Sequence, residues 1–260
     1  MMDIKNYTLG RGKISFARFA PGTQRPDGFA YFGNTPEFNL TIESEVLDHF
    51  SSDEGIREKD DSIPLQVNRT GSLTTDNIAA RNIALFFFGD DSLVTQVAAT
   101  AQSETLEGIK LGHSYRLGMT TANPTGFFGI DTADLTLTTG AVPLVVDVDY
   151  TIKPEFGTIT FLESSTVVTD GDDVDVDYSI KASTRERIIS GTQPVEGALM
   201  YEATNPKGKL FHYYMPYVKI SPNGDYALKS DEWQAIPFTL DIQKPNVGEA
   251  IYVDGAPAFS

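Results

Sequence analysis

The chain has 260 residues, enough to bury a sizeable core in one large domain or two small ones. Its net charge of −16 argues against tight binding of nucleic acid through clustered lysine and arginine, but suits a passage through which DNA slides without sticking. The absence of cysteine excludes disulfides, cysteine-ligated zinc and a thiol nucleophile.

The first elements along the chain are strands. Residues 13–20 and 29–32 predict two strands joined by a turn at residues 21–27. Residues 38–46 alternate between apolar and polar side chains, which predicts a half-buried strand with an acidic outer face. Its inward side chains are those of Phe38, Leu40, Ile42 and Val46, and its outward ones are those of Asn39, Thr41, Glu43 and Glu45.

A long polar connection follows, and then the clearest helix of the sequence. Residues 47–62 are almost entirely polar, and residues 63–69 predict a second strand with Ile63, Leu65 and Val67 inward. The two strands predict an antiparallel pair with an extended tip. Asp76 is the expected N-cap of a helix over residues 77–88, which ends at Gly89. Residues 92–105 predict a linker or an edge strand.

The rest of the chain predicts more strands. Within a middle module of residues 106–188, the segment 145–180 predicts three strands with turns at residues 155–157 and 170–171. Residues 197–203, 209–220, 232–242 and 250–253 predict the C-terminal strands. The expected class is mainly β. Residues 1–105 and 189–260 form one expected domain, and residues 106–188 are either an added module or part of the same sandwich.

None of the chemically suggestive residues forms a catalytic or metal-binding motif. The densest carboxylate cluster consists of Asp170, Asp172, Asp173, Asp175 and Asp177. As a calcium loop beginning at Asp173 it fails, because Tyr178 and Thr184 occupy the positions that require Gly and Glu. An exposed strand face, with Val174, Val176 and Tyr178 inward, explains it better. His49, His113 and His212 show no ligand spacing. We expect no enzymatic activity, metal or cofactor.

A group of aromatic residues near the C-terminus has two interpretations. Its members are Phe211, Tyr213, Tyr214, Tyr217, Trp233 and Phe238. They could form a platform on which a ligand stacks, but strand alternation favours a division between core and interface. Residues 1–13 lack the apolar segment of a signal peptide, and no run approaches the roughly 20 apolar residues of a membrane span. We therefore expect folding in a cytoplasm, without a membrane.

Several segments resemble the major tail tube protein of long-tailed, non-contractile bacteriophages. The similarity is carried by LGRGKISFARF, YFGNTPEFNLTIESEVLDHFSSDEGIREKD, SLTTDNIAARNIALFFFG and KISPNGDYALKSDEWQAIPFTLDIQKP. It covers roughly residues 6–90 and 190–245. The resemblance implies a β-sandwich with one flanking helix, assembled as stacked hexameric rings around a lumen through which double-stranded DNA passes. It also implies tape-measure, tail-tip and tail-terminator partners, and a place in the virion tail after assembly in the host cytoplasm.

The resemblance assigns roles to particular residues. Glu43 and Glu45 would face an acidic lumen, and the long loop would contact the neighbouring ring. The residues of this inter-ring arm are Asp48, Asp53, Glu54, Arg57, Glu58, Lys59, Asp60 and Asp61. Glu54, Arg57, Glu58 and Lys59 are candidates for inter-ring ion pairs.

Two other functions compete with a tube subunit. The first is a carbohydrate- or receptor-binding β-sandwich, such as a tail-tip or decoration protein that uses residues 106–184. A stability shift induced by a saccharide would favour it. The second is a hydrolase with an unrecognised acidic pair, and no sequence feature supports this function. The acidic charge has its own ordinary explanation, since it keeps a protein soluble.

Overall fold

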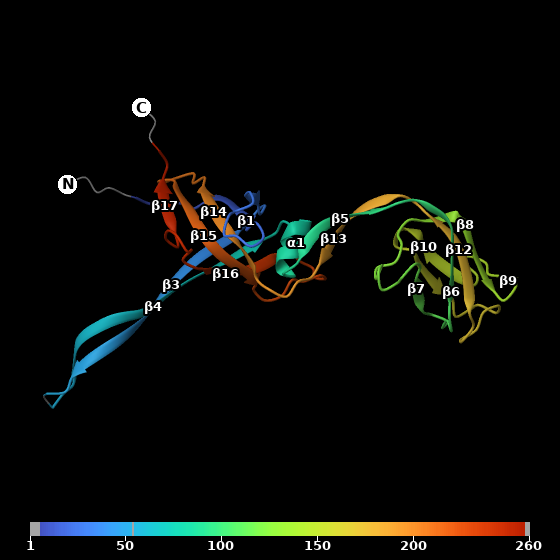
Figure 1. The fold of residues 1–260 in the computed structure, drawn as a ribbon, viewed down its shortest axis with the longest axis horizontal. Helices are drawn as coiled ribbons and strands as arrows, with labels where there is room; N and C mark the ends of the chain where they lie inside the picture. The colour runs from blue at the N-terminus through green and yellow to red at the C-terminus, as the bar shows by residue number, and fades with distance from the viewer. Residues whose placement is uncertain (1–5, 54, 258–260) are drawn as a thin grey trace. The chain divides into compact units, whose positions relative to one another are not determined.

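A computed structural model describes residues 6–53 and 55–257 and confirms the mainly β class. The chain forms two compact units (Figure 1). The terminal unit contains Met1–Ser92 and Arg187–Ser260, and the middle unit contains Leu93–Glu186. The expected module boundaries at residues 106 and 188 therefore differ from the observed ones, chiefly because a strand at residues 99–106 pairs within the middle unit.

One antiparallel sheet forms the terminal unit. Its order is β2-β1-β14-β15-β16-β4-β3, and β17 also pairs with β15. The strands are β1 (Gly12–Arg18), β2 (Ala30–Tyr31), β3 (Glu37–Ser51), β4 (Glu58–Thr75), β14 (Val195–Ala203), β15 (Phe211–Pro222), β16 (Ile236–Ile242) and β17 (Tyr252–Gly255). The sheet coils strongly, since the ring of Phe38 on β3 lies 5.7 Å from that of Tyr201 on β14, four strands away in the order.

The core of this unit lies inside the coiled sheet and is partly covered by the helix α1 (Ala80–Phe86). Leu85 is buried in this core, and Ile83 and Phe86 pack against it. The helix is shorter than the expected span of residues 77–88, and the prediction that Asp76 caps it is wrong. Asp76 instead accepts a hydrogen bond from Asn34 Nδ2 at 2.6 Å. Ala79 stands at the N-cap with no side-chain hydrogen bond.

A local network explains the late start of the helix. Asn77 Nδ2 and Asn82 Nδ2 both donate to the carbonyl of Phe32, at 3.1 and 2.8 Å. Asn82 Nδ2 also donates to the carbonyl of Asn77 at 2.8 Å. Residues 76–79 are thereby held in a non-helical conformation against the segment that follows β2, and tertiary hydrogen bonds override the local capping signal.

The predicted polar loop at residues 47–62 is largely strand. β3 and β4 pair from Glu37↔Thr74 to Ser51↔Glu58, so only residues 52–57 connect them. The prediction that Ile42, Val46, Ile63, Leu65 and Val67 face a core is also wrong, because these side chains are 43–64% exposed. β16 pairs with β4 only as far as Thr70, and beyond that residue nothing described covers either face of the hairpin.

The middle unit is a small sandwich of two antiparallel sheets. One has the order β10-β11-β7 and the other β6-β12-β8-β9. The elements are β6 (Ala99–Leu106), β7 (Ser114–Arg116), β8 (Ile130–Thr139), β9 (Val142–Pro143), β10 (Tyr150–Lys153), the short helix η1 (Pro154–Phe156), β11 (Thr158–Phe161) and β12 (Val174–Ile180). Both sheets contribute to one core, to which β11 gives Ile159 and Phe161 and β12 gives Val174 and Val176.

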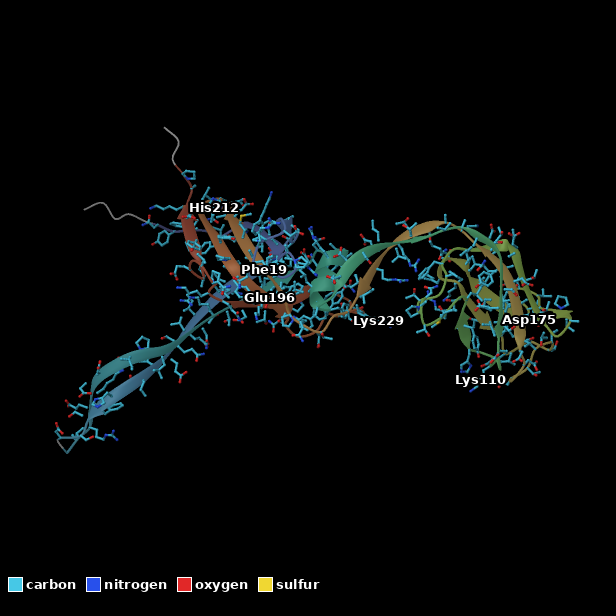
Figure 2. The ribbon with its side chains drawn as sticks, in the orientation of Figure 1. Phe19, Lys110, Asp175, Glu196, His212 and Lys229 are labelled. Atoms are coloured by element: carbon cyan, nitrogen blue, oxygen red, sulfur yellow. The ribbon has the colours of Figure 1, made fainter. Side chains whose placement is uncertain are left out.

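The three strands predicted over residues 145–180 are confirmed, as are the buried positions of Val174, Val176 and Tyr178. Asp175 and Asp177 alternate with them on the exposed face, where Figure 2 labels Asp175. Two strands, β5 (Asp90–Gln96) and β13 (Ser183–Ile189), pair with each other and contain the boundaries between the units.

The C-terminal aromatic residues do not form one platform. Phe238 is fully buried between β4 and β15, whereas Trp233 is 97% exposed. The interpretation that places part of this group in the core is therefore confirmed for Phe238.

Candidate assembly surfaces of the terminal unit

The hairpin of β3 and β4 beyond Thr70 is the most unusual feature of the terminal unit, and we call residues 42–69 the arm. With a rise of about 3.3 Å per residue, the ten residues from Ile42 to Ser51 extend roughly 30 Å. Two register shifts, between Glu45 and Val46 and between His49 and Phe50, interrupt the pairing. Figure 1 shows the arm leaving the sheet, and Figure 2 shows side chains projecting along its length.

One face of the arm is rich in apolar side chains. Alternation along β3 and the register with β4 place five apolar residues on what we call the apolar arm face: Ile42, Val46, Phe50, Pro64 and Val67. Ser44, Asp48, Lys59, Ser62 and Arg69 lie on the same face. Ile42 is 64% exposed and Val67 is 43% exposed. The same face continues toward the root of the arm as Phe38 and Leu40, which pack against the core. A surface that is core at one end is therefore open to solvent at the other.

Charged side chains near the tip pair across the two strands. Lys59 Nζ lies 2.5 Å from Asp48 Oδ1, and His49 Nδ1 lies 2.5 Å from Asp60 Oδ1. The hydrogen bond from His49 lowers the pKa of Asp60 below its ordinary value. Arg57 lies over the ring of Phe50, 5.7 Å from its centroid. Lys59 and Arg57, both predicted to form inter-ring ion pairs, thus have partners inside the arm.

The remaining predicted arm residues occupy exposed positions. Asp53 is exposed between the two strands, and Glu58 begins β4 opposite Ser51. Asp61 Oδ1 accepts a hydrogen bond from the backbone N–H of Ser62 at 2.8 Å. Glu54 lies outside the described residues.

The opposite side of the sheet carries a broad polar surface, which includes the predicted lumen residues Glu43 and Glu45. Register across β3, β4 and β16 places ten side chains on this polar face: Asn39, Thr41, Glu43, Glu45, Gln66, Asn68, Thr70, Ser72, Thr239 and Asp241. Farther along the arm, the exposed Leu47 and Ile63 lie on the same side. None of these ten positions is lysine or arginine, and three are carboxylates.

Lys219, a cation beside this polar face, is neutralised. Lys219 on β15 stands opposite Asp241, and its Nζ lies 3.0 Å from Glu196 Oε1. The hydrogen bond from Lys219 lowers the pKa of Glu196, and the same contact raises the pKa of Lys219. Figure 2 labels Glu196 beside Phe19. The backbone N–H of Phe19 donates a hydrogen bond to the backbone carbonyl of Glu196 at 3.1 Å.

A groove of about 630 Å³ opens at the root of the arm. Besides two tyrosines, its lining consists of Gly10, Arg11, Gly12, Ile14, Asn34, Thr35, Pro36, Phe38 and Leu40. Its aromatic lining consists of Phe38, Tyr201 and Tyr213, whose rings contact one another in sequence at 5.7 and 5.8 Å. Burial and the neighbouring Tyr213 raise the pKa of Tyr201. Arg11 lies at the edge of the groove.

The family model described as "protein of unknown function UCP028589" matches residues 7–246, which include both units. The chain belongs to this family. No curated protein matches the chain.

The described residues contain no cluster of three or more His, Asp or Glu side chains arranged to hold a metal ion. Within the same residues, no helix is long and apolar enough to cross a membrane.

Sequence reasoning missed the apolar arm face and the groove. The alternation of Ile42 and Val46 was read correctly as strand, but alternation alone does not reveal whether a partner layer exists. The groove combines residues more than 150 positions apart, such as Phe38 and Tyr201, and only the coiling of the sheet brings them together. The pairing of His49 with Asp60 depends on the register of the hairpin, whereas the sequence predicted a loop at these residues.

Proposed function

We propose that the chain is a structural subunit of a bacteriophage tail tube, which assembles as hexameric rings stacked around a lumen for DNA. The observation that carries the proposal is the polar face of β3, β4 and β16, with its three carboxylates and no lysine or arginine. A duplex that slides along such a surface meets hydroxyls, amides and carboxylates, and it finds no cation that would hold its phosphates. In the tube, Glu43 and Glu45 face the lumen.

The edge strand supports assembly by a separate argument. β3 is the last strand of its sheet and is 15 residues long, so its outer backbone N–H and C=O groups lack a partner strand among the described elements. A long exposed edge promotes uncontrolled pairing unless another strand or subunit covers it. Closure of a barrel across six subunits would cover the edge of every copy, and the polar face would line that barrel.

In this proposal the arm makes the contact between rings. Its exposed apolar face is unfavourable in water, so covering that face with a neighbouring ring would stabilise the assembly. A head-to-tail contact propagates without limit, so tape-measure and terminator proteins would set the tube length and a tail-tip protein would start assembly. The subunit would fold in the host cytoplasm and end in the virion tail.

Electron microscopy of the purified chain, dilute and concentrated, tests the proposal. We expect hollow tubes or six-fold rings from the unchanged chain. In the matched variant, an Asn-Gly turn replaces residues 50–60, joining His49 and Asp61, which already stand opposite each other. This variant should remain folded, because the removed segment contributes nothing to the core, and it should form no tubes. Normal tubes from the variant would refute a role of residues 50–60 in the contact between rings.

A further inference from the structure

The apolar arm face cannot reach a covering surface within the terminal unit. The face lies on a paired hairpin that extends away from the sheet for roughly 30 Å, so it cannot fold back onto its root without breaking the β3–β4 pairing. Phe50 is 40% exposed even though Arg57 lies over its ring. No described part of the terminal unit covers this face, so it is available to a second molecule.

The groove at the root of the arm is an opening in the core of the terminal unit. The seven-residue helix α1 packs against β15 and β16 and leaves the far end of the coiled sheet uncovered. There the groove runs between β1 and β3, over Ile14 and the rings of Phe38, Tyr201 and Tyr213. An extended segment with apolar side chains on one face would complete the interior at this end.

The charges around the groove and on the arm are opposite. Arg11 N–H donates to Asn205 Oδ1, Asn205 Nδ2 donates to the Lys209 carbonyl, and Leu9 N–H donates to the Lys207 carbonyl. These bonds hold the backbone of Lys207 and Lys209 near the segment that contains Leu9 and Arg11, and Arg11 also lines the groove. We call Arg11, Lys207 and Lys209 the cationic rim. Residues 48–61, at the end of the arm, contain six carboxylates and two cations.

We propose that the groove between β1 and β3 receives the arm of a second copy of this chain. The apolar arm face covers the aromatic lining, and the carboxylates of the arm lie against the cationic rim. Arm and groove are different surfaces, so the contact is heterologous and every copy can both give and accept an arm. This inference deepens the proposed function, because it names the surface that receives the assembly arm.

Site-specific cross-linking of the full chain tests the proposal, since the natural sequence has no cysteine to interfere. One variant carries Val46→Cys on the apolar arm face, and the other carries Thr35→Cys in the wall of the groove. Each has a single cysteine, so a product joining the two variants in a mixture is necessarily intermolecular. With a short bis-maleimide we expect this product to dominate at high protein concentration.

The matched control is Gln66→Cys, which is also on the arm but on the polar face. Mixed with Thr35→Cys, it should give several-fold less cross-linked product. Adding Arg11→Glu to the Thr35→Cys variant should lower the yield with Val46→Cys, because the variant reverses one charge of the cationic rim. Circular dichroism confirms that each variant is folded.

Each alternative result has a definite meaning. A dominant product between two Val46→Cys chains would show that arms pair with arms and would overturn the groove as the receiving surface. Equal yields from Val46→Cys and Gln66→Cys, or no product at any concentration, would also overturn it. Tubes seen without the Val46–Thr35 product would leave the proposed function standing and refute this inference. The Val46–Thr35 product without tubes would support this inference and refute the proposed function.

Discussion

At the scale of single residues, Tyr178 shows how burial and a hydrogen bond act together in the middle unit. Its side chain is 3% exposed, and its hydroxyl donates to Glu104 Oε1 at 2.8 Å. Glu104 Oε1 also accepts a hydrogen bond from the backbone N–H of Gly118 at 2.7 Å. One carboxylate oxygen thus connects β6, β12 and the segment after β7. Burial, followed by the contact with Glu104, raises the pKa of Tyr178 above its ordinary value of 10.0.

This shift predicts a loss of stability in alkaline solution. A raised pKa in the folded state means that the stabilising contribution is complete below the unfolded value of 10.0 and is lost as the pH rises above it. We therefore expect the melting temperature of the middle unit to fall as the pH rises above 10.0. Tyr178→Phe should reduce this dependence and cost about 1.5–3 kcal/mol at neutral pH, where the hydrogen bond to Glu104 is lost.

Differential scanning calorimetry over this pH range measures the effect. The exposed Tyr7 offers a control, since Tyr7→Phe removes a hydroxyl from a side chain that is 68% exposed. A Tyr178→Phe variant with the same alkaline loss as the unchanged chain would contradict the prediction. Tyr150 in the same unit also has a pKa raised by burial, so the expected change in slope is partial.

At the scale of one element, β4 passes from a buried environment to an exposed one. Near its end, Leu73 is 1% exposed in the core between β3 and β16. Earlier in the same strand, Val67 is 43% exposed on the apolar arm face. Gly71 marks the crossing, where an added Cβ would lie 2.9 Å from the carbonyl oxygen of Asn39. Residues with similar side chains in one strand therefore have different energetic roles.

This difference predicts contrasting mutational effects. Leu73→Ala should lower the free energy of unfolding by about 2–5 kcal/mol, because it leaves a cavity in the core. Val67→Thr should change that free energy by less than about 0.5 kcal/mol, because the side chain is not part of the core. Urea denaturation of the monomeric chain measures both. A large destabilisation by Val67→Thr would mean that another part of the chain covers the arm.

The same strand shows what could be predicted from the sequence. Alternation of apolar and polar residues predicted strands at residues 38–46 and 63–69, and both exist. It could not reveal that β16 ends its pairing at Thr70, so the side chains assigned to a core project into solvent. The helix was predicted but not its start, because side chains of Asn77 and Asn82 bind the distant Phe32 carbonyl.

For the candidate site, sequence reasoning identified surfaces within one strand and missed those made by several. Glu43 and Glu45 were assigned to an exposed face, and both are exposed. Their eight neighbours on the polar face come from three strands whose register the sequence does not state. The groove needs Phe38 and Tyr213 to meet across a coiled sheet, which no local pattern encodes.

At the scale of the whole molecule, the described residues form two separate hydrophobic cores. The core of the terminal unit is built from residues 14–85 and 199–250, whereas that of the middle unit is built from residues 109–180. No buried residue belongs to both clusters. Cooperativity in unfolding follows from shared packing, so two cores without common members should melt as two units.

We therefore expect two calorimetric transitions in the monomeric chain, which single core substitutions can assign. Ile159→Ala removes a fully buried side chain from the middle unit, and Leu199→Ala does the same in the terminal unit. Each should cost about 2–5 kcal/mol. For units of this size a loss of 1 kcal/mol lowers the melting temperature by roughly 2–8 °C, so the shift is easily measured.

Ile159→Ala should lower the melting temperature of one transition and Leu199→Ala that of the other. If either variant lowers both transitions together, the two cores are coupled and the middle unit is an integral part of the subunit. If each lowers only its own, the middle unit folds independently, and variants without it can be used to test assembly by the terminal unit alone.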